Sequence, residues 1–148
     1  MQENIHITVA AIIENDNRFL LVEELVHGQT VYNQPAGHLE DNETLIAASI
    51  RETLEESAWQ FVPEYITGIY QWSPPENEQT FLRFCFAGQH QQHDKERQLD
   101  SGIIRAVWLD RQEIISRQDQ LRSPLVLTCI DDYLKGQRYP LELLQHVI

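Results

Sequence analysis

The chain has 148 residues, 42% of them hydrophobic, and a formal net charge of −12. This length predicts a single domain, residues 1–148, whose core needs no disulfides. The negative charge argues against non-specific binding to nucleic acids or anionic membranes, because both need clustered Lys and Arg. Residues 1–13 lack the basic region of a signal peptide, and no apolar run approaches the roughly 18 residues of a membrane span.

The first half of the chain predicts three strands and a loop. Residues 5–14 are β-branched and apolar, and residues 18–25 follow a turn at 15–17 as the returning strand of a hairpin. Residues 30–33 form a short third strand. Residues 34–38 predict a loop, because they contain a proline and a glycine.

A helix is predicted next. Asp41 or Asn42 can cap its N-terminus, and Glu43 then lies in the first turn. The helix is expected to continue to about Ala58, and Pro63 marks the exit from this region.

Three carboxylates share one face of this predicted helix, because residues three and four apart are neighbours. They are Glu52, Glu55 and Glu56, and apolar residues at 46, 50 and 54 lie opposite. Like charges at this spacing repel by about 0.2–0.5 kcal/mol per exposed pair. Mg²⁺ prefers oxygen ligands and commonly joins carboxylates to substrate phosphates. The face therefore predicts a Mg²⁺ site for a phosphorylated substrate, and the alternative is a solvated acidic surface.

The second half predicts three more strands and two helices. The strands are expected near 64–74, 80–87 and 102–109, with a hairpin loop at 73–77 and an exposed loop at 89–101. A short helix is expected after Asp110. A second helix is expected with Ser123 as its N-cap, Pro124 as its first residue and Gly136 just beyond its end. The tail after Gly136 is apolar enough to pack on the body. Strands mixed with helices predict an α+β fold, an α/β/α sandwich.

Cys85 and Cys129 both lie in apolar stretches. We expect two buried thiols in a reducing cytoplasmic compartment rather than a disulfide. Neither has a His or Cys at zinc-ligand spacing.

The spacing G-x5-E-x7-R-E-x-x-E-E, formed by Gly37, Glu43, Arg51, Glu52, Glu55 and Glu56 within residues 37–59, resembles the signature of the Nudix hydrolase family. The sequence departs from the family pattern at Thr53, Ala58 and Trp59. Residues 33–40, 71–72, 81–84, 122–126 and 136–142 further resemble a subgroup of bacterial phosphatases in this family.

The resemblance implies a mixed β-sheet between helices and a loop–helix–loop signature. It also implies Mg²⁺-dependent hydrolysis, with Mn²⁺ as a possible substitute, of nucleoside di- and triphosphates and hydroxymethylpyrimidine pyrophosphate with release of inorganic phosphate. The implied metal ligands are Glu52, Glu55, Glu56 and the carbonyl of Ala36. Arg51 and Glu43 would hold the loop against the helix.

A water molecule must attack phosphorus with the help of a base, for which Glu52 and Asp100 are both candidates. For the substrate, Trp72 could stack on a ring or fill the core. Arg83 lies in an apolar strand, so it needs an anionic partner, either a phosphate or a protein carboxylate. Gln34 and Arg122 are candidates only because of their neighbours in the sequence.

The histidines carry less information. His6 is expected to be a core or edge residue, and His90 and His93 are expected in a solvated loop. His38 lies in the signature loop but is not a signature residue.

Three alternatives to this function remain. The chain could be a Nudix enzyme of another specificity, for ADP-ribose, an oxidised nucleotide or a dinucleoside polyphosphate. It could be a nucleotide sensor without turnover, or a protein-interaction domain with an acidic helix. We expect a small phosphorylated substrate as the partner, no nucleic acid, no membrane, and a monomer or weak homodimer.

Overall fold

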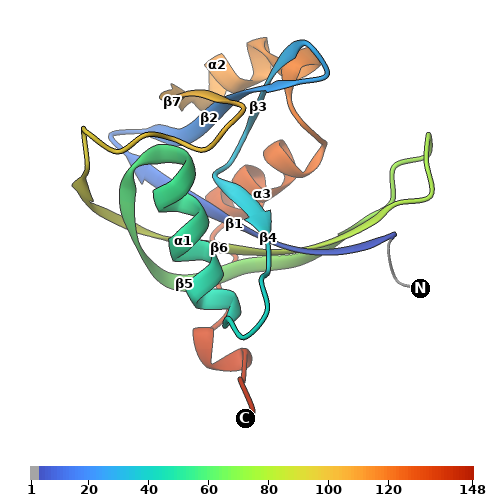
Figure 1. Ribbon diagram of the computed structural model, residues 1–148, viewed down its shortest axis with the longest axis vertical. Coiled ribbons are helices and arrows are strands. Elements are labelled where there is room, and N and C mark those ends of the chain that lie inside the picture. Colours follow the sequence, from blue (N-terminus) through green and yellow to red (C-terminus); the bar gives the residue numbers. More distant parts are fainter. Residues whose placement is uncertain (1–3) are drawn as a thin grey trace.

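The computed structural model describes residues 4–148, and it folds as strands and helices around one mixed sheet (Figure 1). The elements are β1 (Ile5–Asn15), β2 (Arg18–Val26), β3 (Gln29–Asn33), β4 (Ala36–His38), α1 (Leu45–Ser57), β5 (Trp59–Trp72), β6 (Thr80–His93), β7 (Ile103–Asp110), α2 (Arg111–Ser116), η1 (Gln118–Gln120), α3 (Leu125–Leu134) and η2 (Leu141–Leu143). In residues 4–148 no helix has the length and apolar character needed to cross a membrane.

The sheet has seven strands, five of them in the order β3-β2-β1-β6-β5. β1 and β6 are parallel, and the other pairs are antiparallel. β4 pairs with the first half of β1, and β7 pairs with β2. This mixed sheet confirms the predicted fold class.

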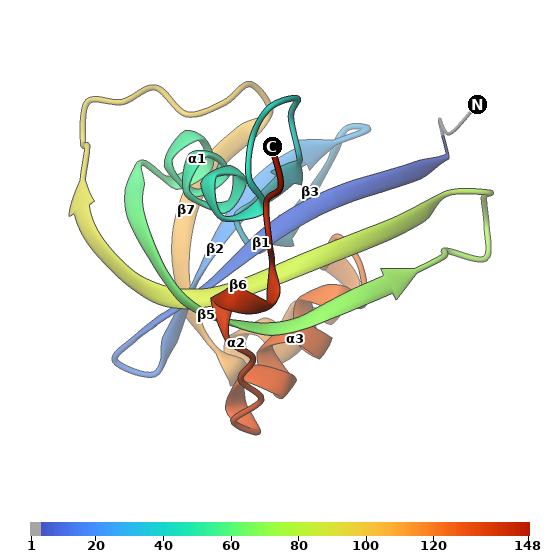
Figure 2. The ribbon, with the colours of Figure 1, turned by 90° about the horizontal axis from the view of Figure 1, so that it is seen from below.

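Helices α1 and α3 cover opposite faces of the sheet (Figure 2). Successive residues of a strand point to opposite faces, so β1 supplies both cores. The α1 side contains Val9, Ala11, Ala48, Phe61 and Phe86. The α3 side contains Ala10, Ile12, Cys85, Cys129 and Ile130. The two cysteines are buried and unpaired, as predicted.

The boundaries of α1 differ from the prediction. Thr44, not Asp41 or Asn42, caps the helix, and its hydroxyl accepts a hydrogen bond from the Ala47 N–H at 3.0 Å. Glu43 lies before the helix, not in its first turn, and its side chain contacts Arg51. α1 ends at Ser57, and Ala58 closes it in the left-handed conformation, with φ of 63°.

The expected exit at Pro63 was wrong, because β5 begins at Trp59 and Pro63 lies inside it. The chain tolerates Pro63 there because β5 is an edge strand and its register shifts at this point. The predicted loop at 34–38 contains the short strand β4. α3 begins at Leu125, so Pro124 precedes the helix instead of opening it.

The predicted loop at 89–101 was partly wrong, because β6 continues to His93. The long β5 gives these residues backbone partners. Aromatic rings pack there: His90 lies 4.8 Å from Trp59 and 5.3 Å from Trp108 between ring centroids, and His93 lies 4.5 Å from Trp59. His90 is therefore part of an aromatic cluster rather than a solvated loop.

The remaining caps agree with the sequence. Asp110 caps α2, and Gly136 has a φ of 83° after α3. The tail packs on the body, because Tyr139 and Ile66 exchange two backbone hydrogen bonds of 2.8 Å.

Candidate active site

Arg51 fastens the loop before α1 to the helix. Its Nε donates to Glu43 Oε2 at 2.6 Å, and its Nη2 donates to Glu43 Oε1 and to the His38 carbonyl, both at 3.0 Å. Hydrogen bonding from Arg51 lowers the pKa of Glu43. The forked geometry of a guanidinium suits this contact with two carboxylate oxygens. The structure thus has the loop-to-helix tie expected of Arg51 and Glu43.

Arg51 also reaches two of the three helix carboxylates. Its Nη1 donates to Glu52 Oε1 and to Glu55 Oε1, both at 2.8 Å. Hydrogen bonds that Arg51 donates, first of all to Glu43, raise its pKa, so its charge is permanent. One cation therefore donates to three carboxylates and lies 3.6 Å from a fourth, Glu40, and Glu56 is not among them.

Gly37 lets β4 approach α1 closely. A Cβ atom at this position would overlap the carboxyl group of Glu52. Glu52 is only 9% exposed, and burial raises its pKa while Arg51 opposes the rise. The glycine of the signature is therefore required for space beside Glu52.

Glu56 is the carboxylate that the protein leaves without a cation. Its Oε1 accepts a hydrogen bond from the Ala36 N–H at 2.9 Å. Within residues 4–148 no Lys, Arg or His nitrogen lies within 4 Å of its oxygens. Burial raises the pKa of Glu56 to about 8, and the charges of Glu52 and Glu24 add to the rise. An added cation is the missing partner of this group.

Glu55 and Asp100 extend the acidic cluster away from Glu56. Glu52, Glu55 and Asp100 each offer a carboxylate oxygen, and these oxygens lie within 4.8 Å of one another. The Asp100 N–H donates to the Glu55 carbonyl at 3.0 Å, which holds the loop against α1. Burial and the Glu55 charge raise the pKa of Asp100. This set of hard oxygen donors fits a divalent cation such as Mg²⁺.

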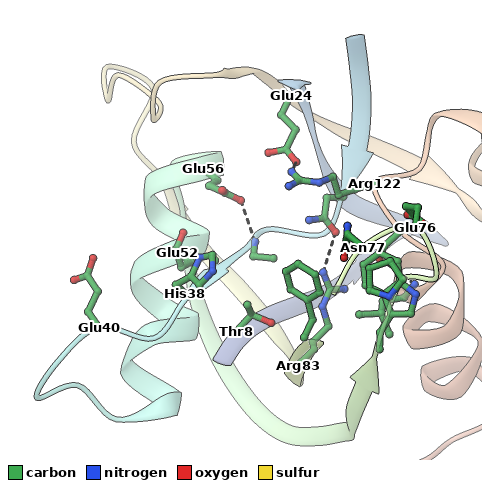
Figure 3. A pocket seen from close by; sticks show the side chains of 18 residues that line it. Thr8, Glu24, His38, Glu40, Glu52, Glu56, Glu76, Asn77, Arg83 and Arg122 are labelled. Atoms are coloured by element: carbon green, nitrogen blue, oxygen red, sulfur yellow. Dashed lines mark hydrogen bonds and ion pairs between the residues drawn. The ribbon is translucent and has the colours of Figure 1, made fainter. Parts of the chain in front are cut away.

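A cavity of about 600 Å³ opens beside Glu52 and Glu56 (Figure 3). It is lined by Thr8, Glu24, Asn33, Ala36, Gly37, His38, Glu40, Glu52, Glu56, Trp72, Pro74, Glu76, Asn77, Phe81, Arg83, Arg122, Ser123 and Leu125. Two of the three helix carboxylates therefore face one cavity, whereas Glu55 and Asp100 lie outside its lining.

Side chains from three paired strands form the wall of the cavity opposite α1. Thr8 of β1 lies beside His38 of β4 on one side and beside Arg83 of β6 on the other. Residues opposite one another on paired strands share a face, so these side chains form one row across three strands. Phe81 and Trp72 form the next row outward.

Arg83 is 5% exposed and has no carboxylate partner among the described residues. Its Nη1 donates to Gln34 Oε1 at 2.9 Å, and its Nη2 donates to Asn33 Oδ1 at 3.1 Å. Its Nε has no hydrogen-bond partner. Of the two anionic partners expected for Arg83, a phosphate or a protein carboxylate, the described part of the chain does not supply the carboxylate.

Gln34 does not line the cavity, contrary to its expected contact with substrate. It is 1% exposed, and its amide nitrogen donates to the Val126 carbonyl at 2.9 Å while its oxygen accepts from Arg83. Both ends of the amide are engaged inside the protein. Gln34 thus positions Arg83.

Trp72 both packs and faces the cavity. Its ring stacks on Phe81 with centroids 5.4 Å apart, and Phe81 stacks on His6 at 4.7 Å. His6 also contacts the side chains of His38, at 3.0 Å, and Gln79. Arg122 lies at the rim, where its Nη1 donates to Glu24 Oε1 at 2.9 Å.

Several residues of the cavity lining were not predicted as site residues from the sequence, among them Thr8, Glu24, Asn33 and Phe81. Thr8 and Phe81 alternate with core residues on their strands, so the choice of face depended on a register that only the paired strands define. Glu24 and Asn33 carry no local signal.

Carboxylates of α1 and the guanidinium of Arg83 thus face one cavity, which suits a metal ion and a phosphorylated substrate. The comparisons with known proteins identify the class as a hydrolase of phosphoric anhydride bonds. The NUDIX domain family matches residues 4–128. The chain belongs to the Nudix family.

Two relatives cover most of the chain. Phosphatase NudJ of Escherichia coli (strain K12) is 42% identical over 139 residues, which are 94% of this chain and 90% of NudJ. A NUDIX hydrolase structure from Nitrosomonas europaea is 50% identical with a TM-score of 0.94, covering 96% of this chain and 97% of that one. A MutT protein from Methanosarcina mazei Go1, 20% identical with a TM-score of 0.71 over 93% of this chain and 99% of that one, shares the fold.

Proposed function

We propose that this Nudix hydrolase is a Mg²⁺-dependent phosphatase of nucleoside di- and triphosphates and related pyrophosphates, such as hydroxymethylpyrimidine pyrophosphate. It releases inorganic phosphate. The observation that carries the proposal is the buried, cation-free carboxylate of Glu56, which faces a cavity with Arg83 on its opposite wall. The similarity to proteins named phosphatase NudJ supports the substrate class.

Glu52, Glu55, Glu56 and the carbonyl of Ala36 would hold the metal ion. When bound, Mg²⁺ or Mn²⁺ supplies positive charge that neutralises phosphate oxygens and favours ionisation of an attacking water. Arg51 keeps Glu52 and Glu55 in place through two hydrogen bonds of 2.8 Å. Asp100 lies beside Glu55 and adds negative charge to the same cluster.

Glu52 is the better candidate for the base that accepts a proton from water. It lines the cavity, and burial raises its pKa, which makes the carboxylate a stronger base. Asp100, the other candidate from the sequence, does not line the cavity. We therefore assign Asp100 to the support of Glu55 and Glu52.

The far side of the cavity suits the rest of the substrate. Trp72, stacked on Phe81, offers a ring face to a nucleobase or pyrimidine. Arg83 and Arg122 offer positive charge to the phosphates. Gln34 acts indirectly, by holding Arg83.

A substrate screen that measures both inorganic phosphate and the nucleotide products tests this function. The purified protein is assayed with nucleoside di- and triphosphates, hydroxymethylpyrimidine pyrophosphate, ADP-ribose, an oxidised nucleotide and a dinucleoside polyphosphate, each with Mg²⁺ or with EDTA. We expect phosphate from the nucleoside di- and triphosphates and from hydroxymethylpyrimidine pyrophosphate with Mg²⁺, and none with EDTA. Cleavage only of ADP-ribose, the oxidised nucleotide or the dinucleoside polyphosphate would assign another Nudix specificity. Nucleotide binding without turnover would assign a sensor.

The protein-interaction alternative is less favourable because Glu52 and Glu56 face a cavity instead of forming an exposed acidic surface. We further propose a cytoplasmic enzyme, which two buried, unpaired cysteines support. The proposed oligomeric state is a monomer or weak homodimer, which sedimentation analysis over a range of concentrations would test.

A further inference from the structure

Two arginines line the cavity, and they have different partners. Arg122 is about half exposed and is paired with the Glu24 carboxylate at 2.9 Å. Arg83 is almost completely buried and contacts two neutral amides instead. A guanidinium remains charged at physiological pH. Arg83 therefore keeps an uncompensated positive charge where solvent contributes little screening.

The groups around Arg83 leave its positive charge without a counter-ion. Because the Gln34 amide nitrogen donates to the Val126 carbonyl, the amide oxygen must face Arg83. The neighbouring thiol of Cys129 is also close, since Arg83 contributes to the lowered pKa of that thiol, although contact with Cys85 contributes more. No carboxylate within residues 4–148 lies within 4 Å of Arg83.

Two donors at this position have no partner in the described part of the chain. Arg83 Nε is buried away from solvent without a partner. Asn33 lines the cavity and accepts from Arg83 through its oxygen, and its amide nitrogen donates to no group in the described part of the chain. A buried charge and unpaired donors are costly unless a ligand satisfies them. The matching ligand is an anion with several acceptor oxygens.

We infer that Arg83, Asn33 and Gln34 form a phosphate subsite, in which Arg83 and Asn33 contact the non-bridging oxygens of a phosphoryl group and Gln34 positions Arg83. The inference rests on the proposed function, and it adds Asn33 to the residues that touch the substrate. Neutral amides are essential to the subsite, because a carboxylate in either position would cancel the charge of Arg83 and repel phosphate.

The variant Asn33→Asp tests this directly. It preserves the size of the side chain and the oxygen that accepts from Arg83, but it introduces a negative charge and removes the free amide donor. The matched control is Asn77→Asp, which makes the same chemical change at the hairpin tip on the cavity rim, where Asn77 Oδ1 accepts from the Gln79 N–H. Inorganic phosphate is titrated calorimetrically into each full-length protein in the presence of Mg²⁺.

We expect Asn33→Asp to weaken phosphate binding at least tenfold and Asn77→Asp to change it less than threefold. The melting temperature of Asn33→Asp should equal or exceed that of the wild type, because Arg83 gains an ion pair. If Asn33→Asp does not fold, Gln34→Glu introduces the charge on the other side of the guanidinium, at the cost of the hydrogen bond to the Val126 carbonyl. Phosphate affinity within twofold of the wild type in a folded variant would overturn the subsite.

Failure of the phosphate subsite can be distinguished from failure of the proposed function. If the wild type releases no phosphate from any substrate but its phosphate binding still depends on Asn33, the hydrolytic function fails and the subsite stands. If the wild type hydrolyses diphosphates with Mg²⁺ and Asn33→Asp has unchanged phosphate affinity and unchanged KM, the subsite fails and the function stands.

Discussion

Glu56 Oε1 accepts a hydrogen bond of 2.9 Å from the backbone N–H of Ala36, and this contact joins α1 to β4 across the mouth of the cavity. A single N–H donor does not neutralise a buried carboxylate, so the pKa of Glu56 remains raised, at about 8. The contact fixes the position of the Glu56 carboxyl group, and burial without a cation raises its pKa. A fixed oxygen ligand without a protein cation is what a metal site needs.

The raised pKa of Glu56 predicts how the stability of the metal-free protein depends on pH. The folded state holds the Glu56 proton more tightly than the unfolded state, so this contribution to stability is present below about pH 4.5 and is lost as the pH rises through about 8. The melting temperature in EDTA should therefore fall over this range by roughly 5 °C more in the wild type than in Glu56→Gln. Parallel curves of melting temperature against pH for the two proteins would contradict a raised pKa of Glu56.

Gly37→Ala should damage the site more than the fold. The new methyl group would overlap the Glu52 carboxyl, which is the flexible end of a side chain and can move aside. We expect kcat to fall at least tenfold while the free energy of unfolding falls by about 1–3 kcal/mol. Gly136→Ala is a useful comparison, because its φ of 83° strains an alanine at a helix end outside the cavity lining, so it should lower stability without lowering kcat. Full activity in Gly37→Ala would show that Glu52 need not stay in place.

Arg51→Lys should destabilise the protein, because an ammonium cannot replace a fork that contacts Glu43, Glu52 and Glu55 together. Urea titration should give a loss of about 1–3 kcal/mol. The control is Arg111→Lys, since Arg111 makes a two-point contact with Asp131 on the surface, where solvent screens the ion pair, and its loss of stability should be smaller than that of Arg51→Lys. Equal effects at the two positions would argue against a special role for Arg51.

Trp72→Ala should raise KM for a nucleoside diphosphate by roughly tenfold, because a lost stacking contact costs about 1–3 kcal/mol. KM for inorganic tripolyphosphate, which has no ring, should change little, and Trp72→Phe should restore most of the nucleotide affinity. A similar rise in KM for both substrates would indicate that Trp72 only supports Phe81 and the wall.

The helix carboxylates and their neighbours could be predicted from the sequence because their arrangement is local. Glu55 and Glu56 lie one helical turn after Glu52, and the tie from Arg51 to Glu43 spans only eight residues. The caps at Asp110 and Gly136 follow the same logic, since each depends on adjacent residues.

Trp72, Arg83 and Arg122, which line the other half of the cavity, were candidates from the sequence, but their arrangement could not be predicted, because contacts between distant segments create it. Gln34 was expected in the cavity, but its bond to Val126, 92 residues away, places it behind Arg83. The short strand β4 forms because β1 offers it partners, although its own sequence reads as a loop. The split between Glu56, inside the cavity, and Glu55, beside Asp100, likewise depends on the 94–102 loop folding over α1.

The most direct test of the metal-assisted mechanism is the rate of phosphate release from a nucleoside diphosphate by the wild type and by Glu56→Gln, each with Mg²⁺ and with EDTA. The amide keeps the acceptor for Ala36 and removes the charge. We expect wild-type activity only with Mg²⁺, and a rate at least tenfold lower for Glu56→Gln, equal to about 1.4 kcal/mol in the barrier. Equal rates for the two proteins, or wild-type turnover that persists in EDTA, would contradict a metal held by the carboxylates of α1.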